Sequence, residues 1–360
     1  MGKVLNIIVI SCIALIVLSL SGGCDIKNDV WGSWFNETPH DAEESNLPDE
    51  LSLKQTIFDT NIIDDEDKQV CLFYYPDKEG RFLVPVYRPM PEREDIARAV
   101  LEQLVSSSSL DEKLSAAGLA TSIPENTIIR GISIEDQIAT VNFSASFTTY
   151  PQEKEKLVMN SVWGALQQFE TIDQVNIKVE GVDIEEFNGD SIVEQPLGPD
   201  LKINMEVKAD TEDFGEASAV KVYFNYFADG YIFHVPVNRV IEPQEDLIKA
   251  SVEELLESPR SNKGLYSDIP SRTQFLDYSL EEDNNGENII SVNFSSELLN
   301  YSGGVTGEKN IIRQIVLTLT EHPEIDGVEI LVEGEKLFPQ KAELSQPFSA
   351  PKLINFLSLE

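Results

Sequence analysis

The apolar and polar positions divide the chain into three parts of different character. Residues 4–20 are almost wholly apolar, whereas residues 24–69 are rich in Asp, Glu and Asn and show little apolar periodicity. From residue 70 onward, some segments alternate apolar and polar residues and others repeat apolar residues at helical spacing, which predicts strands and helices. We therefore expect an extended, self-repelling tether over residues 24–69 and a folded region after it.

The start of the chain has the pattern of an exported protein. Lys3 precedes the apolar stretch, and Ser21-Gly22-Gly23-Cys24 follows it. This order predicts a signal peptide over residues 1–23. The alternative is a transmembrane anchor, but the run is at the short end of the roughly 17–25 residues that span a bilayer, and small residues rather than positive charges directly follow it. The small residues before Cys24 resemble a bacterial lipoprotein signal, which implies that a lipid on Cys24 anchors the chain to the membrane.

The remaining chain is one unit written twice. Val84-Pro85-Val86-Tyr87-Arg88 recurs as Val235-Pro236-Val237-Asn238-Arg239, with an offset of 151 residues (235 − 84 = 151). Val141-Asn142-Phe143-Ser144 recurs at the same offset, and Gln195-Pro196 returns as Gln346-Pro347. Each repeat is far longer than a solenoid unit, so each copy should have its own core. The sequence predicts domains over residues 70–189 and 220–340, a linker over 190–219 and a C-terminal tail over 341–360.

The second copy shows the order of elements most clearly. Its alternating segments predict strands, and its segments with helical spacing predict helices. The expected strands cover 221–227, 231–236, 275–280, 289–294 and 328–332; the expected helices begin at Pro243 and cover 308–321. The first copy repeats this ββαββαβ order, with helices near 92–107 and 153–169. Such units are typical of the α+β class, in which amphipathic helices cover one face of a small sheet in two layers.

Charge and cysteine content narrow the possible functions. The chain has 63 acidic and 27 basic residues, a formal charge of −36. Such a charge repels nucleic acid and anionic lipid headgroups. We therefore expect no nucleic-acid partner, and membrane attachment only through apolar or lipid groups. The three cysteines, Cys12, Cys24 and Cys71, build neither a disulfide framework nor a CxxC metal site.

The order and spacing of several short motifs resemble a known family. In the second copy these motifs are Val222-Tyr223-Phe224, Val292-Asn293-Phe294-Ser295, Thr318-Leu319-Thr320-Glu321 and the strand from Val328 to Gly334. Together they resemble the GerM sporulation and germination domain. The first copy is more divergent, with Ala165-Leu166-Gln167-Gln168 where the family has Thr-Leu-Thr-Glu. With the signal, Cys24 and the acidic tether, the tandem copies resemble the GerM lipoproteins end to end.

This resemblance implies a fold of the ring-building class, in which wedge-shaped domains pack side by side, so an oligomeric ring is possible. It also implies a place on the outer face of the cell membrane and, during sporulation, in the space between the mother-cell and forespore membranes. The partners that it implies there are the stage II and stage III sporulation proteins that link the two compartments. A high negative charge on every protomer opposes self-stacking unless basic partners or cations intervene.

The histidines and Cys71 do not form a repeated chemical site. His40 lies in the tether, His234 in a predicted strand and His322 at a predicted helix end. The matching residues of the other copy are of different types: Leu83 for His234, Phe169 for His322, and Lys221 for Cys71. We expect His234 to be a core or hairpin residue, His322 to be a helix-end residue favoured by the helix dipole, and Cys71 to be a packed thiol.

Three further motifs favour structural interpretations. Residues 302–309 look like a phosphate loop but lack the adjacent Gly-Lys-Ser/Thr, which predicts a loop and a helix start. The glycosylation-like sequences at Asn142 and Asn293 are expected to be strand ends, and the recurring carboxylates Glu102 and Glu253 to be solvated. The sequence thus predicts no catalytic, cofactor-binding or metal-binding residue, and a direct enzyme is the least favoured class.

Two functions from different classes stay open. The leading hypothesis is a non-enzymatic, lipid-anchored scaffold for sporulation and germination, which acts as an interaction module in the transenvelope complex. The alternative is a cell-wall lipoprotein that binds peptidoglycan or assists a hydrolase, because domains like these also occur in proteins attached to wall amidases. Binding to purified sacculi separates the two hypotheses.

Overall fold

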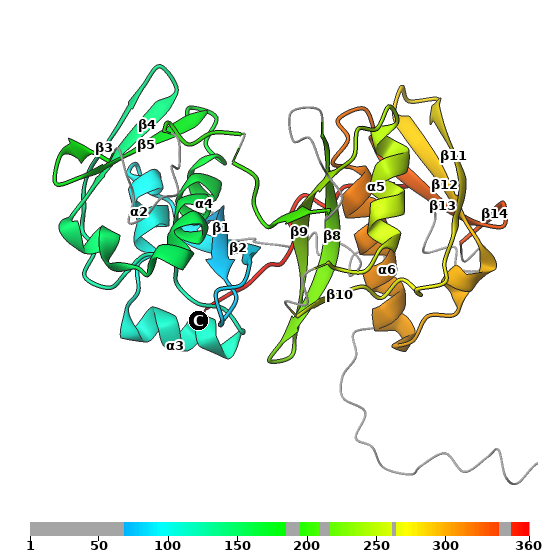
Figure 1. The fold of residues 1–360 in the computed structure, drawn as a ribbon, viewed down its shortest axis with the longest axis horizontal. Coiled ribbons are helices and arrows are strands. Elements are labelled where there is room, and N and C mark those ends of the chain that lie inside the picture. Colours follow the sequence, from blue (N-terminus) through cyan, green and yellow to red (C-terminus); the bar gives the residue numbers. More distant parts are fainter. Residues whose placement is uncertain are drawn as a thin grey trace, which may run out of the picture. The chain divides into compact units, whose positions relative to one another are not determined.

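The computed structural model describes residues 68–184, 195–199, 201–208, 217–260, 264–337 and 347–359 (Figure 1). The predicted signal, the lipidation residue Cys24, His40 and nearly all of the tether lie outside these ranges. Within them, no helix has the length and the apolar character that crossing a membrane requires.

Copy 1, which we define as residues 68–184, contains the predicted ββαββαβ order. Its main elements are β1 (Lys68–Pro76), β2 (Leu83–Pro91), α2 (Ile96–Glu102), α3 (Ser108–Ala116), β3 (Ile129–Glu135), β4 (Ile138–Phe143), α4 (Glu155–Leu166), β5 (Gln174–Val179) and β6 (Val182–Asp183). Helix α3 is an addition to the predicted order. It buries only Leu114, so it lacks the apolar face by which a helix is recognised in sequence.

Copy 2, defined as residues 217–337, repeats the order without a counterpart of α3. Its elements are β8 (Ser218–Ala228), β9 (Tyr231–Ile241), α5 (Leu247–Leu256), β10 (Leu265–Tyr266), β11 (Phe275–Glu282), β12 (Asn288–Phe294), α6 (Gly304–Leu319), β13 (Gly327–Val332) and β14 (Glu335–Lys336). The segments after the copies are tail 1 (195–199 and 201–208), which holds β7 (Met205–Val207), and tail 2 (347–359), which holds β15 (Phe348–Ser349).

Two helix starts differ from expectation. The helix predicted to begin at Pro243 begins at Leu247, because the carboxylate of Asp246 accepts a hydrogen bond from the Lys249 amide at 2.9 Å and caps the first turn. Helix α6 begins at Gly304, one turn before the expected residue 308. Its N-cap, Gly303, has a φ of 87°, a left-handed conformation that glycine adopts without strain. Residues 302–309 are therefore a loop and a helix start, as predicted.

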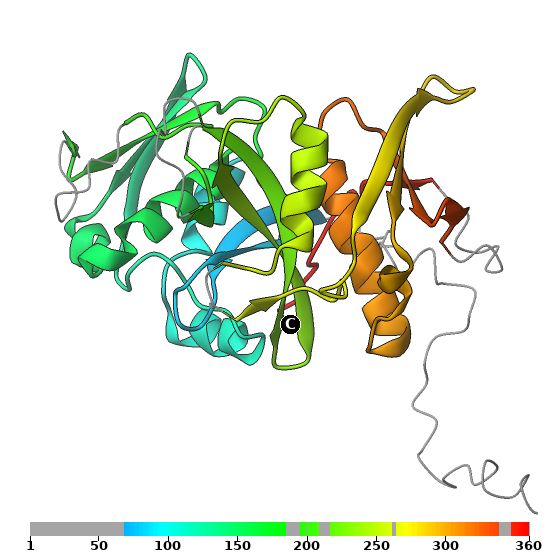
Figure 2. The same ribbon diagram turned by 45° about the vertical axis from the view of Figure 1, so that its right-hand side comes forward.

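Apart from α3, the helices of each copy lie between an outer sheet and a hairpin (Figures 1 and 2). The outer sheets run in the orders β3-β4-β5-β6 and β11-β12-β13-β14, each with one parallel pair at its centre. On the other side, α4 contacts β1, and α5 and α6 contact β8. The α+β class is confirmed, and the hairpin adds a further layer over the helices. As a result α4 buries ten of its 12 residues.

The apolar core of copy 1 extends into copy 2. Its buried cluster includes Tyr226, Phe233 and Val235 of the β8/β9 hairpin and Leu357 of tail 2. A second cluster, by contrast, lies within copy 2 and tail 2. The hairpins also touch directly, since β2 contacts β9. We call this contact, together with the two tails that border it, the seam.

Candidate functional site

The recurring Val-Asn-Phe-Ser motif forms a junction between strands in both copies. In copy 1 the Asn142 side-chain oxygen accepts a hydrogen bond from the Gly181 amide at 2.8 Å, and in copy 2 Asn293 accepts one from Gly334 at 3.0 Å. In each copy this bond joins the end of the first parallel strand to the turn that follows the second parallel strand. The asparagines close strands, as predicted from the sequence, and their side chains are occupied by backbone groups.

The matched carboxylates of this junction are also structural. Glu180 has a φ of 52° and accepts a hydrogen bond from the Ala145 amide at 2.9 Å. Glu333 has a φ of 50° and accepts one from the Ser296 amide at 3.0 Å. In each copy a left-handed glycine follows, which closes the tight turn. The repeated Val-Asn-Phe-Ser and Glu-Gly motifs therefore hold the outer sheet together.

The two domain histidines are neutral packing residues. His234 is buried in β9, and its Nδ1 lies 2.8 Å from the Asn225 side-chain oxygen. Burial, with the Arg313 charge nearby, lowers the pKa of His234 to about 3. His322 follows α6, as predicted, with its Nε2 2.8 Å from the Ser251 hydroxyl. Burial lowers its pKa despite the neighbouring carboxylates, so the dipole does not keep it charged.

Cys71 is the packed thiol that the sequence predicts. The residue predicted to match it in copy 2, Lys221, is wrong by one position. The side chain is buried in β1, and burial raises the pKa of the thiol to about 11. In the strand registers Cys71 lies opposite Arg88, while Val220 lies opposite Arg239. Cys71 therefore corresponds to Val220, and not to Lys221. Both residues are buried and apolar in character.

These groups do not converge on a reactive site. No hydrogen bond joins His234, His322 or Cys71 to one another in the described ranges, and no group of three or more His, Cys, Asp or Glu side chains there could hold a metal ion. The recurring carboxylates Glu102 and Glu253 are exposed on their helices, as predicted. The Ser251 hydroxyl beside His322 donates to the Leu247 carbonyl at 2.9 Å, so this pair is a helix-end contact.

Two asparagines at the seam were not predicted from the sequence. Asn204 of tail 1 has a φ of 53°, and its side-chain oxygen accepts from the Leu83 amide at 2.8 Å. Its side-chain nitrogen donates to the Leu83 carbonyl at 2.7 Å and, across the seam, to the Pro236 carbonyl at 2.9 Å. One side chain thus ties β2 of copy 1 to β9 of copy 2.

Asn355 of tail 2 makes the mirror set of bonds. With a φ of 54°, it accepts from the His234 amide at 2.7 Å and donates to the His234 carbonyl at 2.8 Å and, across the seam, to the Pro85 carbonyl at 2.7 Å. Asn355 lies 151 residues after Asn204, the offset of the duplication. The returning Gln-Pro pair, nine residues earlier in each tail, is the sequence signal that points to these asparagines.

Each tail pairs first with its own copy and then crosses to the other copy: Leu197 of tail 1 bridges Val175, and Phe348 of tail 2 lies opposite Val328. Strand β7 of tail 1 pairs in parallel with β9 of copy 2, with Met205 opposite Asn238. In tail 2, Phe356 forms the equivalent parallel bridge to Tyr87 of copy 1, and the Leu357 amide donates to the Tyr87 carbonyl at 2.9 Å. Each tail therefore adds backbone pairing to the copy that it does not follow.

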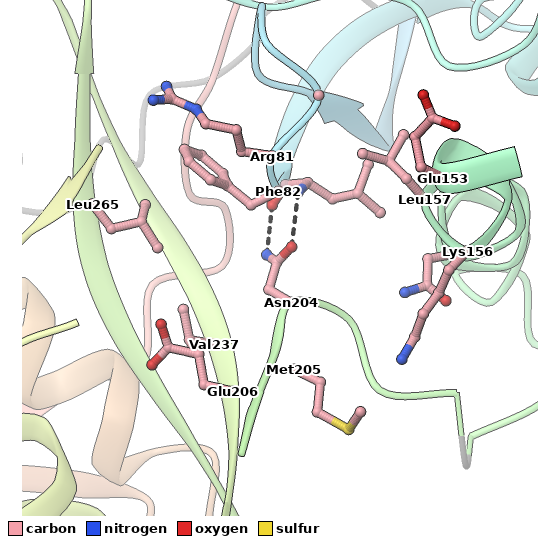
Figure 3. A pocket seen from close by; sticks show the side chains of 13 residues that line it. Arg81, Phe82, Glu153, Lys156, Leu157, Asn204, Met205, Glu206, Val237 and Leu265 are labelled. Atoms are coloured by element: carbon pink, nitrogen blue, oxygen red, sulfur yellow. Dashed lines mark hydrogen bonds between the residues drawn. The ribbon is translucent and has the colours of Figure 1, made fainter. Parts of the chain in front are cut away.

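Two cavities border the seam. The first, of about 230 Å³, contains Asn204 at its centre (Figure 3), with Arg81 and Phe82 on one wall and Leu157 on another. Buried Asn160 also lines it, and its side-chain oxygen has no hydrogen-bond partner in the described residues. The second cavity, of about 220 Å³, is lined by matched residues of both copies: Tyr74 with Tyr223, Pro85 with Pro236, and Tyr87 with Asn238. The seam is thus partly hollow, with polar and apolar side chains on the cavity walls.

The fold and the repeated junctions define a class: a tandem α+β protein whose two copies meet through their hairpins. A family model described as "Germane: Sporulation and spore germination" matches residues 72–185 and 221–338. The chain belongs to this family, which assigns it a sporulation-related role and confirms the resemblance drawn from the motifs.

One protein of known identity and one solved structure of that name are similar to the chain. The spore germination protein GerM of Bacillus subtilis (strain 168) is 28% identical over 291 residues, which cover 78% of this chain and 77% of that protein. The solved structure of the tandem GerMN domains of the sporulation protein GerM from Bacillus subtilis matches with a TM-score of 0.66 and 26% identity, over 80% of this chain and 99% of the other. Neither of these two names is that of an enzyme.

Proposed function

We propose that this chain is a non-enzymatic scaffold of the sporulating cell envelope, anchored by a lipid on Cys24. It acts on the outer face of the membrane, in the space between mother cell and forespore, and holds stage II and stage III sporulation proteins together. The observation that carries the proposal is the family match over both copies, because the relatives are sporulation and germination proteins. The candidate chemical groups, which are packed or bonded to backbone, agree with a binding role.

The surfaces best suited to partners are the outer sheets. The helices α2, α4, α5 and α6 lie between a hairpin and an outer sheet, so they offer no long free face. By contrast, β3 and β11 are edge strands in the described sheets. Strand β11 exposes Leu276 and Leu280 at 42% and 39%. An exposed edge strand can pair with a strand of another protein, with backbone bonds for affinity and side chains for specificity.

Charge indicates the chemistry of these partners. A chain with a formal charge of −36 attracts basic surfaces, and the charge opposes self-stacking unless basic partners or cations intervene. The scaffold would therefore bind basic envelope proteins more readily than it would stack into a ring alone.

A pull-down tests the scaffold against the cell-wall alternative. Residues 50–360, one compact unit, are immobilised and exposed to extracts of sporulating and of growing cells. The scaffold predicts specific recovery of stage II or stage III sporulation proteins from the sporulating extract only. In parallel, the same fragment is mixed with purified sacculi. Pelleting with the sacculi, without recovery of sporulation proteins, would replace the scaffold with the cell-wall function.

The anchor has its own test. Replacing Cys24 with Ala removes the only atom that the lipid can occupy in this signal. We expect the variant to leave the membrane fraction in a cell fractionation, while the wild-type chain stays there. Retention of the variant in the membrane fraction would show that the apolar residues 4–20 anchor the chain instead.

A further inference from the structure

We propose that the seam is a self-complementary dimer interface, closed within one chain by tails that cross between the copies, which also accepts the matching copy of a second chain. The first argument is its symmetry. Asn204 and Asn355 bond to Leu83 and His234, which are equivalent residues, and then cross to Pro236 and Pro85, which are equivalent too. Both copies therefore use the same surface patch and make the same contacts with each other. Such an interface is called isologous and is typical of two-fold symmetric dimers.

The second argument is that the contacts are mainly to backbone. The asparagines bind amide and carbonyl groups, and the β7 pairing is backbone to backbone. Such contacts depend on the path of the chain and not on which chain supplies it. Apolar contacts add to them, since Phe82 of copy 1 packs edge-on against Tyr226 of copy 2, with ring centres 5.0 Å apart. The Tyr226 hydroxyl also donates to the Gly118 carbonyl at 3.0 Å.

One charged contact breaks the symmetry and selects the pairing. Glu206 of tail 1 lies 3.1 Å from Arg239 Nε of copy 2, and the Arg239 side chain is fully buried. Glu254 lies 3.2 Å from the Nη1 of the same arginine. In copy 1 the match of Arg239 is Arg88, and the match of Glu206 is Leu357 of tail 2. Leu357 is also buried.

This difference favours copy 1 with copy 2 over two identical copies. Two copies of type 2 would place Leu357 where Glu206 now meets Arg239, and so remove a partner of a fully buried cation. Two copies of type 1 would place Glu206 beside Arg88, but their pairing would leave the copies of type 2 to pair with each other and to lose the contact between Glu206 and Arg239. Loss of one partner of a buried ion pair is strongly unfavourable. The seam therefore favours the pairing of copy 1 with copy 2, whether the two copies come from one chain or from two chains.

Cleavage of the connection between the copies tests the proposal. A protease site is placed within residues 209–216 of the full soluble chain, residues 50–360, and the folded protein is cut. We expect the pieces to elute together at the volume of the uncut chain. Nitrogen-15-labelled and unlabelled cut samples are then mixed, and native mass spectrometry should detect pairs that combine a labelled with an unlabelled piece.

Matched variants separate the seam from simple folding. Glu206→Leu, which copies the residue of tail 2, should weaken the pairing of the pieces about tenfold or more. Asn204→Gly and Asn355→Gly remove the crossing bonds without backbone strain and should also weaken it. Asn126→Gly is the control, because Asn126 has a similar φ of 64° but is exposed and away from the seam.

Three results would overturn the proposal. The pieces could separate on cleavage while circular dichroism shows both folded. They could stay together but form no mixed pairs after days at dilute concentration. Glu206→Leu could also pair as tightly as the wild type, in which case the charged contact would not select the partner.

Discussion

Copy 1 and copy 2 use the same arginine in different ways. Arg88 and Arg239 stand at equivalent places in the Val-Pro-Val-x-Arg motif. Arg88 donates to the Tyr75 hydroxyl at 2.5 Å and lies over the Phe73 ring. Arg239 instead binds Glu206 and Glu254 in a buried ion pair, and its guanidinium lies over the Phe224 ring. The duplication preserved the position and the aromatic contact, while the charge balance around it diverged.

The end of the long second helix in each copy shows the same combination of a kept position and a changed side chain. In copy 1, Gln168 bonds to both the amide and the carbonyl of Leu72, each at 2.8 Å. In copy 2, the equivalent Glu321 binds Lys221 at 2.7 Å and the Tyr223 hydroxyl at 2.5 Å. Both tie a helix end to the hairpin. The links between layers are kept, and the side-chain chemistry that makes them is free to change.

The largest expected difference between the copies comes from these arginines. Arg239→Leu removes the buried cation that Glu206 and Glu254 share and leaves Arg260 as the cation beside Glu254, which should lower the free energy of unfolding by about 3–5 kcal/mol. Arg88→Leu leaves only neutral partners unpaired and should lower it by about 1–3 kcal/mol. Urea unfolding followed by circular dichroism measures both. Equal losses would show that the ion pair contributes nothing specific to copy 2.

Acid should reveal a second difference, because His234 has no counterpart in copy 1. Its folded pKa of about 3 lies below the unfolded value of about 6.5, so the unfolded chain binds a proton that the folded chain does not. Stability is therefore lost as pH falls through this window, by about 2 kcal/mol between pH 7 and pH 5. His234→Leu, the residue of copy 1, should reduce this loss. An identical loss in the variant would assign the acid sensitivity to other groups.

The strand junctions should respond alike in both copies. Gly181 and Gly334 have φ values of 81° and 82°, and a Cβ at either position would meet no atom within 4 Å. Gly181→Ala and Gly334→Ala therefore test backbone strain alone and should each lower the free energy of unfolding by about 1–2 kcal/mol. Thermal or urea unfolding of the pair checks this. A clearly unequal response would mean that one junction is not the structural equivalent of the other.

Cys71 should give the smallest effect. Burial and a raised pKa of about 11 keep its thiol protonated and covered at neutral pH. In residues 50–360 it is the single cysteine, so a thiol reagent should label the chain only as fast as it opens. Rapid labelling of the native fragment would show that β1 opens readily at the edge of copy 1.

The order of elements was predictable because apolar periodicity is local, as in the alternation of Ile290, Val292 and Phe294. Helix α3 was not, since only Leu114 of that helix is buried. The seam also escaped the sequence analysis, because Asn204 and Asn355 lie in polar tails and their partners are distant in the chain. Cys71 was misaligned because the hairpin is two residues longer in copy 2: Leu83 pairs with Pro76, but the equivalent His234 pairs with Asn225.

The central claim is that the outer sheets of a closed pair of copies bind envelope partners. A photo-crosslinking amino acid placed at Leu276 of β11, in sporulating cells, tests it most directly. Tyr231, which has the same exposure of 42% at the tip of the β8/β9 hairpin, provides the control position. The scaffold predicts a crosslink from Leu276, but not from Tyr231, to a stage II or stage III sporulation protein. A crosslink from Leu276 to peptidoglycan alone, or to nothing, would contradict it.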